Sequence, residues 1–100
     1  MYKVTVLYEQ PEDVVAFDKY YKEHHLALAQ HMSGVSRIEI TKFHSAADGG
    51  RPQYYQMAEL FFGSKIEMEE TMGSPEGQAV INDVHNLTSK PVKIILGSVE

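Results

Sequence analysis

Cysteine is absent from this chain of 100 residues, and no apolar run in it approaches the length of a membrane span. The first absence excludes disulfides, thiol nucleophiles and metal sites built on cysteine. A transmembrane helix needs about 20 consecutive apolar residues, so we expect no membrane partner. The chain begins with a strand pattern and contains no apolar segment typical of a signal peptide, so we expect a cytoplasmic protein.

Basic residues are also few, with 9 Lys and Arg against 14 Asp and Glu and a net charge of −5. A domain that binds nucleic acid needs a basic face, so we expect no nucleic-acid partner. The sequence contains no P-loop, nucleophile elbow or dinucleotide fingerprint, and no histidine pair at the spacing of a helical metal site. We therefore expect neither a cofactor nor a metal ion.

The order of hydrophobic patterns predicts the fold. Apolar residues make up 43% of the chain, an ordinary value for one globular domain, which we expect to span residues 1–100. Alternating and β-branched segments predict strands at residues 2–9, 35–43, 53–62 and 92–99. Helical spacing and stop signals predict helices from 11 or 12 to 31, over 65–72, and from 75 to 85 or 87. This order is typical of the α+β class with a ferredoxin-like split βαββαβ fold, a four-stranded antiparallel sheet with helices on one face.

The third and fourth strands carry apolar side chains at adjacent positions, so both faces of the sheet require cover. The helices cover one face, and 100 residues leave no second layer within the chain. We therefore expect a homodimer that packs sheet face against sheet face, because large exposed apolar patches usually mark interfaces. The alternative is a sheet with an open, moderately apolar face.

The first helix contains the residues best suited to chemistry. Its apolar stripe places His24 near the centre and His25 nearer the edge, beside a cleft between helix and sheet. A neutral imidazole there could act as a general acid or base near pH 7. The alternative is that both histidines only pack against neighbouring side chains or cap the helix.

Several other side chains could complete such a site. Tyr8 is the candidate to assist His25 in catalysis, because a tyrosine at a cleft offers an apolar ring and one hydrogen bond. The candidates to bind substrate are Tyr21, His24, Tyr55 and Met57. The alternative for these side chains is core and interface packing, which is the ordinary role of aromatic residues and methionine.

One segment resembles a known family. The chain reads Leu7-Tyr8, then Phe17-x-x-Tyr20-Tyr21-x-x-x-His25-x-x-Leu28, then Ser33-Gly34-Val35. This resembles the EthD family, first named for ethyl tert-butyl ether degradation, over residues 2–43. The family histidine corresponds to His25. Tyr21 stands where Trp is common, and Ala27 stands where Pro is usual, so the helix can continue past His25.

The resemblance implies a dimeric α+β barrel and an activity of unestablished type. Relatives of that fold include muconolactone isomerases, cofactor-independent monooxygenases and polyketide cyclases. We therefore expect a small cofactor-independent enzyme of oxidoreductase, isomerase or cyclase type, with an apolar or aromatic small molecule in the helix–sheet cleft. The alternative is a non-catalytic small-molecule-binding or accessory protein of a catabolic pathway.

Overall fold

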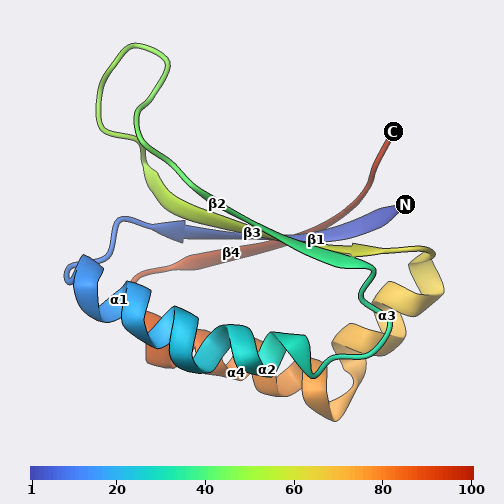
Figure 1. The fold of residues 1–100 in the computed structure, drawn as a ribbon. Helices are drawn as coiled ribbons and strands as arrows, with labels where there is room; N and C mark the ends of the chain where they lie inside the picture. Colours follow the sequence, from blue (N-terminus) through green and yellow to red (C-terminus); the bar gives the residue numbers. More distant parts are fainter.

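The computed structural model describes residues 1–100 as a four-stranded sheet with helices packed beneath it (Figure 1). The strands are β1 (Tyr2–Glu9), β2 (Arg37–Lys42), β3 (Tyr54–Phe62) and β4 (Val92–Ser98). The helical segments are α1 (Val14–Tyr20), η1 (Tyr21–His25), α2 (Leu26–Gln30), α3 (Lys65–Gly73) and α4 (Pro75–Leu87). None of the helices is long and apolar enough to cross a membrane.

The sheet has the strand order β2-β3-β1-β4, and every neighbouring pair is antiparallel. Figure 1 shows all helices on one face, with the β2–β3 loop extending beyond the sheet and the two termini close together. This arrangement confirms the predicted ferredoxin-like α+β fold. The helices lie on the face to which β1 contributes its alternate, most buried residues, namely Val4, Val6 and Tyr8.

The first helix begins later than predicted, at Val14, because Asp13 adopts an extended backbone and accepts a hydrogen bond from the Ala16 amide at 3.0 Å. A side-chain oxygen at this position satisfies an amide that has no partner within the helix. Ser74 acts in the same way at the start of α4, with Pro75 as the first helical residue. The sharp corner between α3 and α4 requires glycine at position 77, since a Cβ there would meet the Thr71 carbonyl oxygen at 2.1 Å.

The middle of the first helical run is a π-helical turn, η1, which the sequence analysis did not predict. The Leu26 amide donates to the Tyr21 carbonyl, five residues back, where an α-helix would use a bond four residues back. The wider turn keeps residues spaced by four on one face, and the buried residues are Phe17, Tyr21, His25 and Ala29.

The π-turn reverses the predicted positions of the two histidines. A regular α-helix places His24 on the buried stripe, because seven residues are close to two full turns. In the structure His24 is exposed and His25 is 4% exposed. The expectation that His24 lies near the stripe centre was wrong, because the extra residue in the turn rotates everything that follows it.

The outer face of the sheet has no covering element in the chain. Apolar side chains on it are those of Leu7, Met57, Phe61 and Ile95, which alternate with the core residues of their strands. Charged groups surround them, with Lys3 Nζ 2.6 Å from a Glu59 oxygen and the Arg37 guanidinium 3.9 Å from the Phe61 ring centroid. This face therefore combines apolar surface with ion pairs.

Candidate functional site

The His25 imidazole lies between a carboxylate and a phenol beneath the sheet. Its Nδ1 atom is 2.9 Å from Asp83 Oδ2, and its Nε2 atom is 3.5 Å from the Tyr8 hydroxyl. A carboxylate can only accept, so Nδ1 carries a hydrogen when the two bond. In the neutral ring, Nε2 then holds the free lone pair and faces Tyr8.

Asp83 lies on α4 and is buried, although the sequence analysis did not select it. Its Oδ1 atom accepts from the Tyr20 hydroxyl at 2.7 Å and from the Asn86 amide at 3.0 Å. Burial raises the pKa of Asp83, but the hydrogen bonds from Asn86, Tyr20 and His25 outweigh it and lower the pKa overall. The side chain is therefore a carboxylate that orients the His25 ring.

Tyr8 and Tyr21 bring two phenols to the same place. Burial, followed by the charges of Tyr21 and Asp83, raises the pKa of Tyr8 far above its ordinary value. Burial also raises the pKa of Tyr21 to about 12, against an opposing effect of the Gln56 amide. The Tyr21 ring lies 5.9 Å from the Tyr8 ring and 5.1 Å from the His25 ring, centroid to centroid. Both phenols are neutral at physiological pH and available as hydrogen-bond donors.

A small apolar cavity adjoins these side chains. Its volume is about 30 Å³, and the predicted residues Tyr8, Tyr21 and His25 all line it. Most of the remaining wall is aliphatic, with residues such as Val6 from the sheet and Val84 from α4. One ordered water needs on the order of 10–15 Å³, so the cavity has room for a very small group unless its walls move. The site is a nearly dry pocket with one basic nitrogen.

The structure separates the other predicted substrate-binding residues from this cavity. His24 is exposed on the helix, with its ring 4.9 Å from the Tyr20 ring. Tyr55 packs its ring against Phe17 and donates to Asp18 Oδ1 at 2.8 Å, outside the cavity wall. Met57 lies on the outer face of the sheet. A role of these residues in binding is untested and stays a prediction.

Gln56 is a further polar residue that the sequence analysis missed. It lies on β3 opposite Tyr8, is 1% exposed, and its amide nitrogen Nε2 has no hydrogen-bond partner. Buried polar atoms without partners are rare in native proteins. The Gln56 amide is close enough to the Tyr21 hydroxyl to lower the pKa of that phenol, but no hydrogen bond of full geometry joins the two. Gln56 is thus a buried donor beside the two phenols, and its hydrogen-bonding capacity is unfilled.

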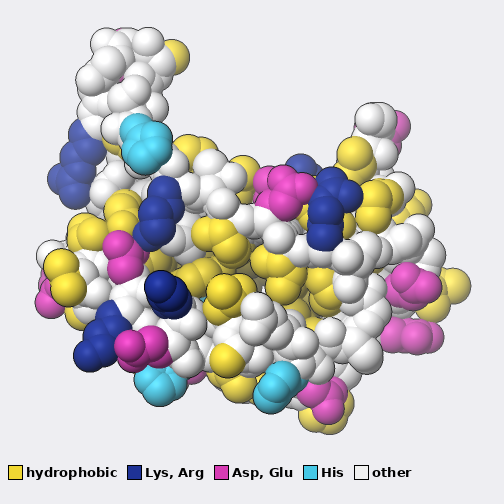
Figure 2. Space-filling model, viewed as in Figure 1, with side chains coloured by type: hydrophobic (Ala, Val, Ile, Leu, Met, Phe, Trp, Pro, Cys, Tyr) yellow, Lys and Arg dark blue, Asp and Glu magenta, His cyan; other side chains and the backbone are white.

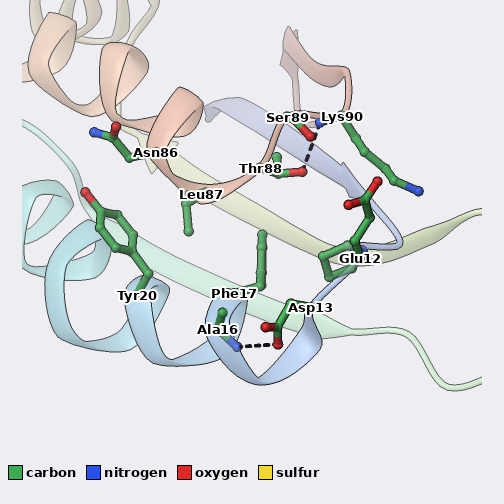
Figure 3. A pocket seen from close by; sticks show the side chains of 11 residues that line it. Glu12, Asp13, Ala16, Phe17, Tyr20, Asn86, Leu87, Thr88, Ser89 and Lys90 are labelled. Atoms are coloured by element: carbon green, nitrogen blue, oxygen red, sulfur yellow. Dashed lines mark hydrogen bonds between the residues drawn. The ribbon is translucent and has the colours of Figure 1, made fainter.

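The far side of the Asp83 network reaches a surface pocket of about 290 Å³ (Figure 3). Figure 3 shows Tyr20 on α1 and Asn86 on α4 at one end of this pocket and Glu12 and Lys90 at the other. The two residues that donate to Asp83 therefore also form a wall of an open, polar pocket. The carboxylate is the link between this pocket and the buried imidazole.

The missed residues carried weak signals in the sequence. Asp83 falls on the stripe of α4 that contains Val80, Val84 and Leu87, an unusual place for an acid. Gln56 falls two residues before Ala58, on the strand positions that face the helices. A polar residue at a core position of a periodic element is the pattern that could have indicated both.

The predicted residues that the structure brings together can move a proton. His25 Nε2 is the acceptor or donor, Asp83 orients the ring, and Tyr8 is within reach of the same nitrogen. No group of three or more histidine and acidic side chains is arranged to hold a metal ion. The arrangement places the groups that proton transfer requires beside an apolar pocket.

Comparisons with known proteins agree on the family. The EthD domain matches residues 9–91. An uncharacterized 11.0 kDa protein from the thcB–thcC intergenic region of Rhodococcus erythropolis is 40% identical over 95 residues, which cover 95% of this chain and 91% of that protein. The crystal structure of an EthD family protein from Bacillus halodurans matches with a TM-score of 0.93 at 28% identity, covering 100% of this chain and 99% of that one.

A more distant match supports the fold alone. A dimeric protein of unknown function with a ferredoxin-like fold from Bacteroides fragilis matches with a TM-score of 0.67 at 16% identity, covering 98% of this chain and 95% of that one. The domain match spans most of the chain, and it includes His25 and Asp83. The resemblance read from residues 2–43 is thereby confirmed, and the chain belongs to the EthD family.

Proposed function

We propose that this protein is a small cofactor-independent enzyme that acts on an apolar or aromatic small molecule, with His25 as the general acid or base. The observation that supports this proposal is the Asp83–His25–Tyr8 series, in which the imidazole bonds a carboxylate at Nδ1 and faces a phenol at Nε2. The carboxylate fixes the ring orientation and stabilises the imidazolium that forms when Nε2 takes a proton.

The surroundings of His25 favour an apolar substrate. The cavity wall is almost entirely hydrophobic, and the neutral phenols of Tyr8 and Tyr21 can donate to a substrate oxygen. Proton transfer by one imidazole suits isomerisation or cyclisation at a carbon beside an oxygen function, and it activates such a carbon for oxidation when dioxygen is the oxidant. Because the two phenols are neutral and Asp83 remains a carboxylate, the proton on His25 is the charge that changes during such a step.

Replacing His25 tests this function. Wild-type protein and the His25→Asn variant are incubated with a panel of small phenols, ketones and lactones, and substrate loss is followed by mass spectrometry. We expect turnover of at least one compound by the wild type and a loss of about 100-fold or more in the variant. The matched control is His31→Asn, an exposed histidine at the C-cap of α2. Equal turnover by His25→Asn and wild type would overturn the assignment.

A non-catalytic binding or accessory role is the second candidate. The observation that favours it is the cavity volume of about 30 Å³, far below the 300 Å³ or more of usual ligand pockets. In this role the Asp83–His25–Tyr8 series is a buried structural network. Ligand binding that survives His25→Asn, without turnover by either protein, would favour this candidate over the enzyme.

The outer face of the sheet supports a homodimer as part of the proposal. Leu7, Met57 and Ile95 lie there with no helix or strand of the chain over them, and a protein of the same fold from Bacteroides fragilis is described as dimeric. Light scattering on the wild type is expected to give twice the chain mass of 11.3 kDa. Ile95→Asp is expected to give monomers, while Ile66→Asp, at an exposed position on α3, leaves the dimer intact. A monomeric wild type would contradict the proposal.

A further inference from the structure

We propose that the groove between η1 and β2 is the entrance to the His25 site, where Gln56 binds an acceptor oxygen of the ligand and the Tyr21 ring separates groove from cavity. This inference rests on the proposed function for the identity of the reacting group. It goes further by assigning an oxygen-binding residue, an entrance and a ligand class.

The groove has a volume of about 310 Å³, within the range of small-molecule sites. Its apolar lining includes Leu26 from α2 and Ile40 from β2, and the buried Gln56 also lines it. It opens on the side of the molecule where β2 is in front, and Figure 2 shows hydrophobic side chains along this side between the helices and the sheet. A ligand of moderate size therefore has space here that the buried cavity alone does not offer.

Gln56 supplies the specific polar contact. In the sheet it is paired with Tyr8 of β1 on one side and with Lys42 of β2 on the other. Gln56 therefore lies between the strand that carries Tyr8 and the edge strand β2. Its Nε2 atom is buried and without a partner, and leaving a donor in this state costs free energy. An acceptor oxygen from a ligand in the groove would satisfy it.

Tyr21 lies at the boundary of the two spaces. It is the one residue that lines both the groove and the cavity beside His25. It is also the first residue of the π-helical turn, and such turns occur frequently at functional sites. A rotation of the Tyr21 ring would join the groove to the cavity and bring a ligand to His25 Nε2.

The charges at the rim select the class of ligand. Lys42 is already bonded to Asp18 and to the Tyr55 hydroxyl at 3.1 Å, so it is not free to bind an anion. Lys22, the other cation that lines the groove, is exposed to water, where an ion pair contributes little. The buried donor without a partner is the neutral Gln56 amide. The groove therefore suits an uncharged apolar molecule with a carbonyl oxygen, such as a ketone or lactone, in preference to a carboxylate.

Nuclear magnetic resonance tests this inference directly, because the Gln56 side-chain amide gives its own signals. The probes are acetophenone and α-methylstyrene, which have the same shape but differ in the carbonyl oxygen. We expect acetophenone to shift the Gln56 side-chain amide signals and α-methylstyrene to leave them nearly unchanged. Shifts confined to Tyr20, Asn86 and Lys90, in the pocket of Figure 3, would overturn the assignment of the groove.

The variant Gln56→Met removes the donor and keeps the side-chain length. Acetophenone is expected to bind it about tenfold more weakly than the wild type, which corresponds to one lost hydrogen bond. Binding of α-methylstyrene is expected to stay the same, and Gln53→Met, at an exposed position, serves as the control. Gln56→Leu gives the same comparison if the methionine variant folds poorly. Unchanged acetophenone affinity would overturn the role of Gln56.

The ring signals of Tyr21 and His25 separate the parts of the proposal. We expect bound acetophenone to shift both, because the ligand passes Tyr21 to reach the imidazole. Shifts at Gln56 without shifts at His25 would overturn the role of Tyr21 as the boundary. Shifts at all three residues, without turnover of any compound, would leave this inference intact and contradict the enzyme assignment.

Discussion

The two sides of the site around His25 differ in how well their polar groups are satisfied. On the α4 side, the Asp83 carboxylate accepts three hydrogen bonds and its pKa is lowered. On the β2 side, the Gln56 amide nitrogen is equally buried and has no partner. The α4 side of the site is a completed hydrogen-bond network, whereas the β2 side has the Gln56 donor without a partner beside an open groove.

This difference indicates separate tasks for the two sides. A completed network holds its members in one orientation, because moving any of them leaves a buried partner unsatisfied. A buried donor without a partner weakens the fold and is retained where something else binds it. The α4 side therefore positions His25, while the β2 side is the place where we propose that a ligand completes the structure. Four variants test this comparison, in order of expected effect.

Asp83→Ala should have the largest effect on stability. It removes the acceptor of three hydrogen bonds and leaves the His25, Tyr20 and Asn86 donors without it. We expect the free energy of unfolding to fall by about 3 kcal/mol. Urea denaturation followed by circular dichroism measures it. A loss below about 1 kcal/mol would show that the network does not hold the two helices together.

Asp83→Asn tests the same network through the pH dependence of its stability. Because the folded state lowers the pKa of Asp83, the carboxylate stabilises the fold above its unfolded pKa of about 3.9, and this contribution is lost as pH falls through the lower folded value. We expect the variant to be less stable than wild type by about 2 kcal/mol at pH 6. The difference should shrink between about pH 4 and pH 2. A difference that is constant over this range would contradict the lowered pKa.

Gln56→Met should change stability in the opposite direction. Replacing a buried, unpartnered amide with an apolar side chain of similar length is expected to raise the free energy of unfolding by about 1 kcal/mol. A thermal melt of the unliganded protein measures it, and an increase of about 4–8 °C corresponds to this value. Destabilisation instead would mean that Gln56 has a structural bond in solution, and the contrast with Asp83 would no longer hold.

Asp18→Asn should have the smallest effect, since it removes a partly exposed ion pair with Lys42 at the rim of the groove. Exposed pairs contribute little, and we expect a change below about 0.5 kcal/mol. The informative readout is binding, because the variant frees Lys42. Benzoate is expected to bind the variant better than the wild type, while acetophenone binds both equally. Strong destabilisation would mean that Asp18 belongs to the core network.

The fold could be predicted from the sequence because its information is local. β1 alternates between core and outer face along Val4, Thr5 and Val6, and that alternation is the burial pattern itself. Tyr8 was identified for a similar reason, since it lies on the alternating stripe of β1. His25 was identified instead from its place at the edge of the helical stripe and from the resemblance to the EthD family. The order of strands and helices then leaves few possible topologies.

The π-turn, Asp83 and Gln56 could not be predicted in the same way. The spacing of Phe17, Tyr21 and His25 fits a π-turn, but a stripe through His24 fits an α-helix equally well, and only packing decides between them. The roles of Asp83 and Gln56 depend on their proximity to His25 and Tyr21, which are distant in the sequence. Their surroundings exist only after α4 and β3 have met the first helix.

The single extra residue in η1 makes His24 and His25 alternatives to each other. With α-helical winding throughout, the imidazole beneath the sheet would be that of His24, seven residues after Phe17. With the observed winding it is that of His25. Adjacent histidines thus give this helix a redundancy, because a change of winding would exchange one imidazole for the other and the sheet would still face a histidine.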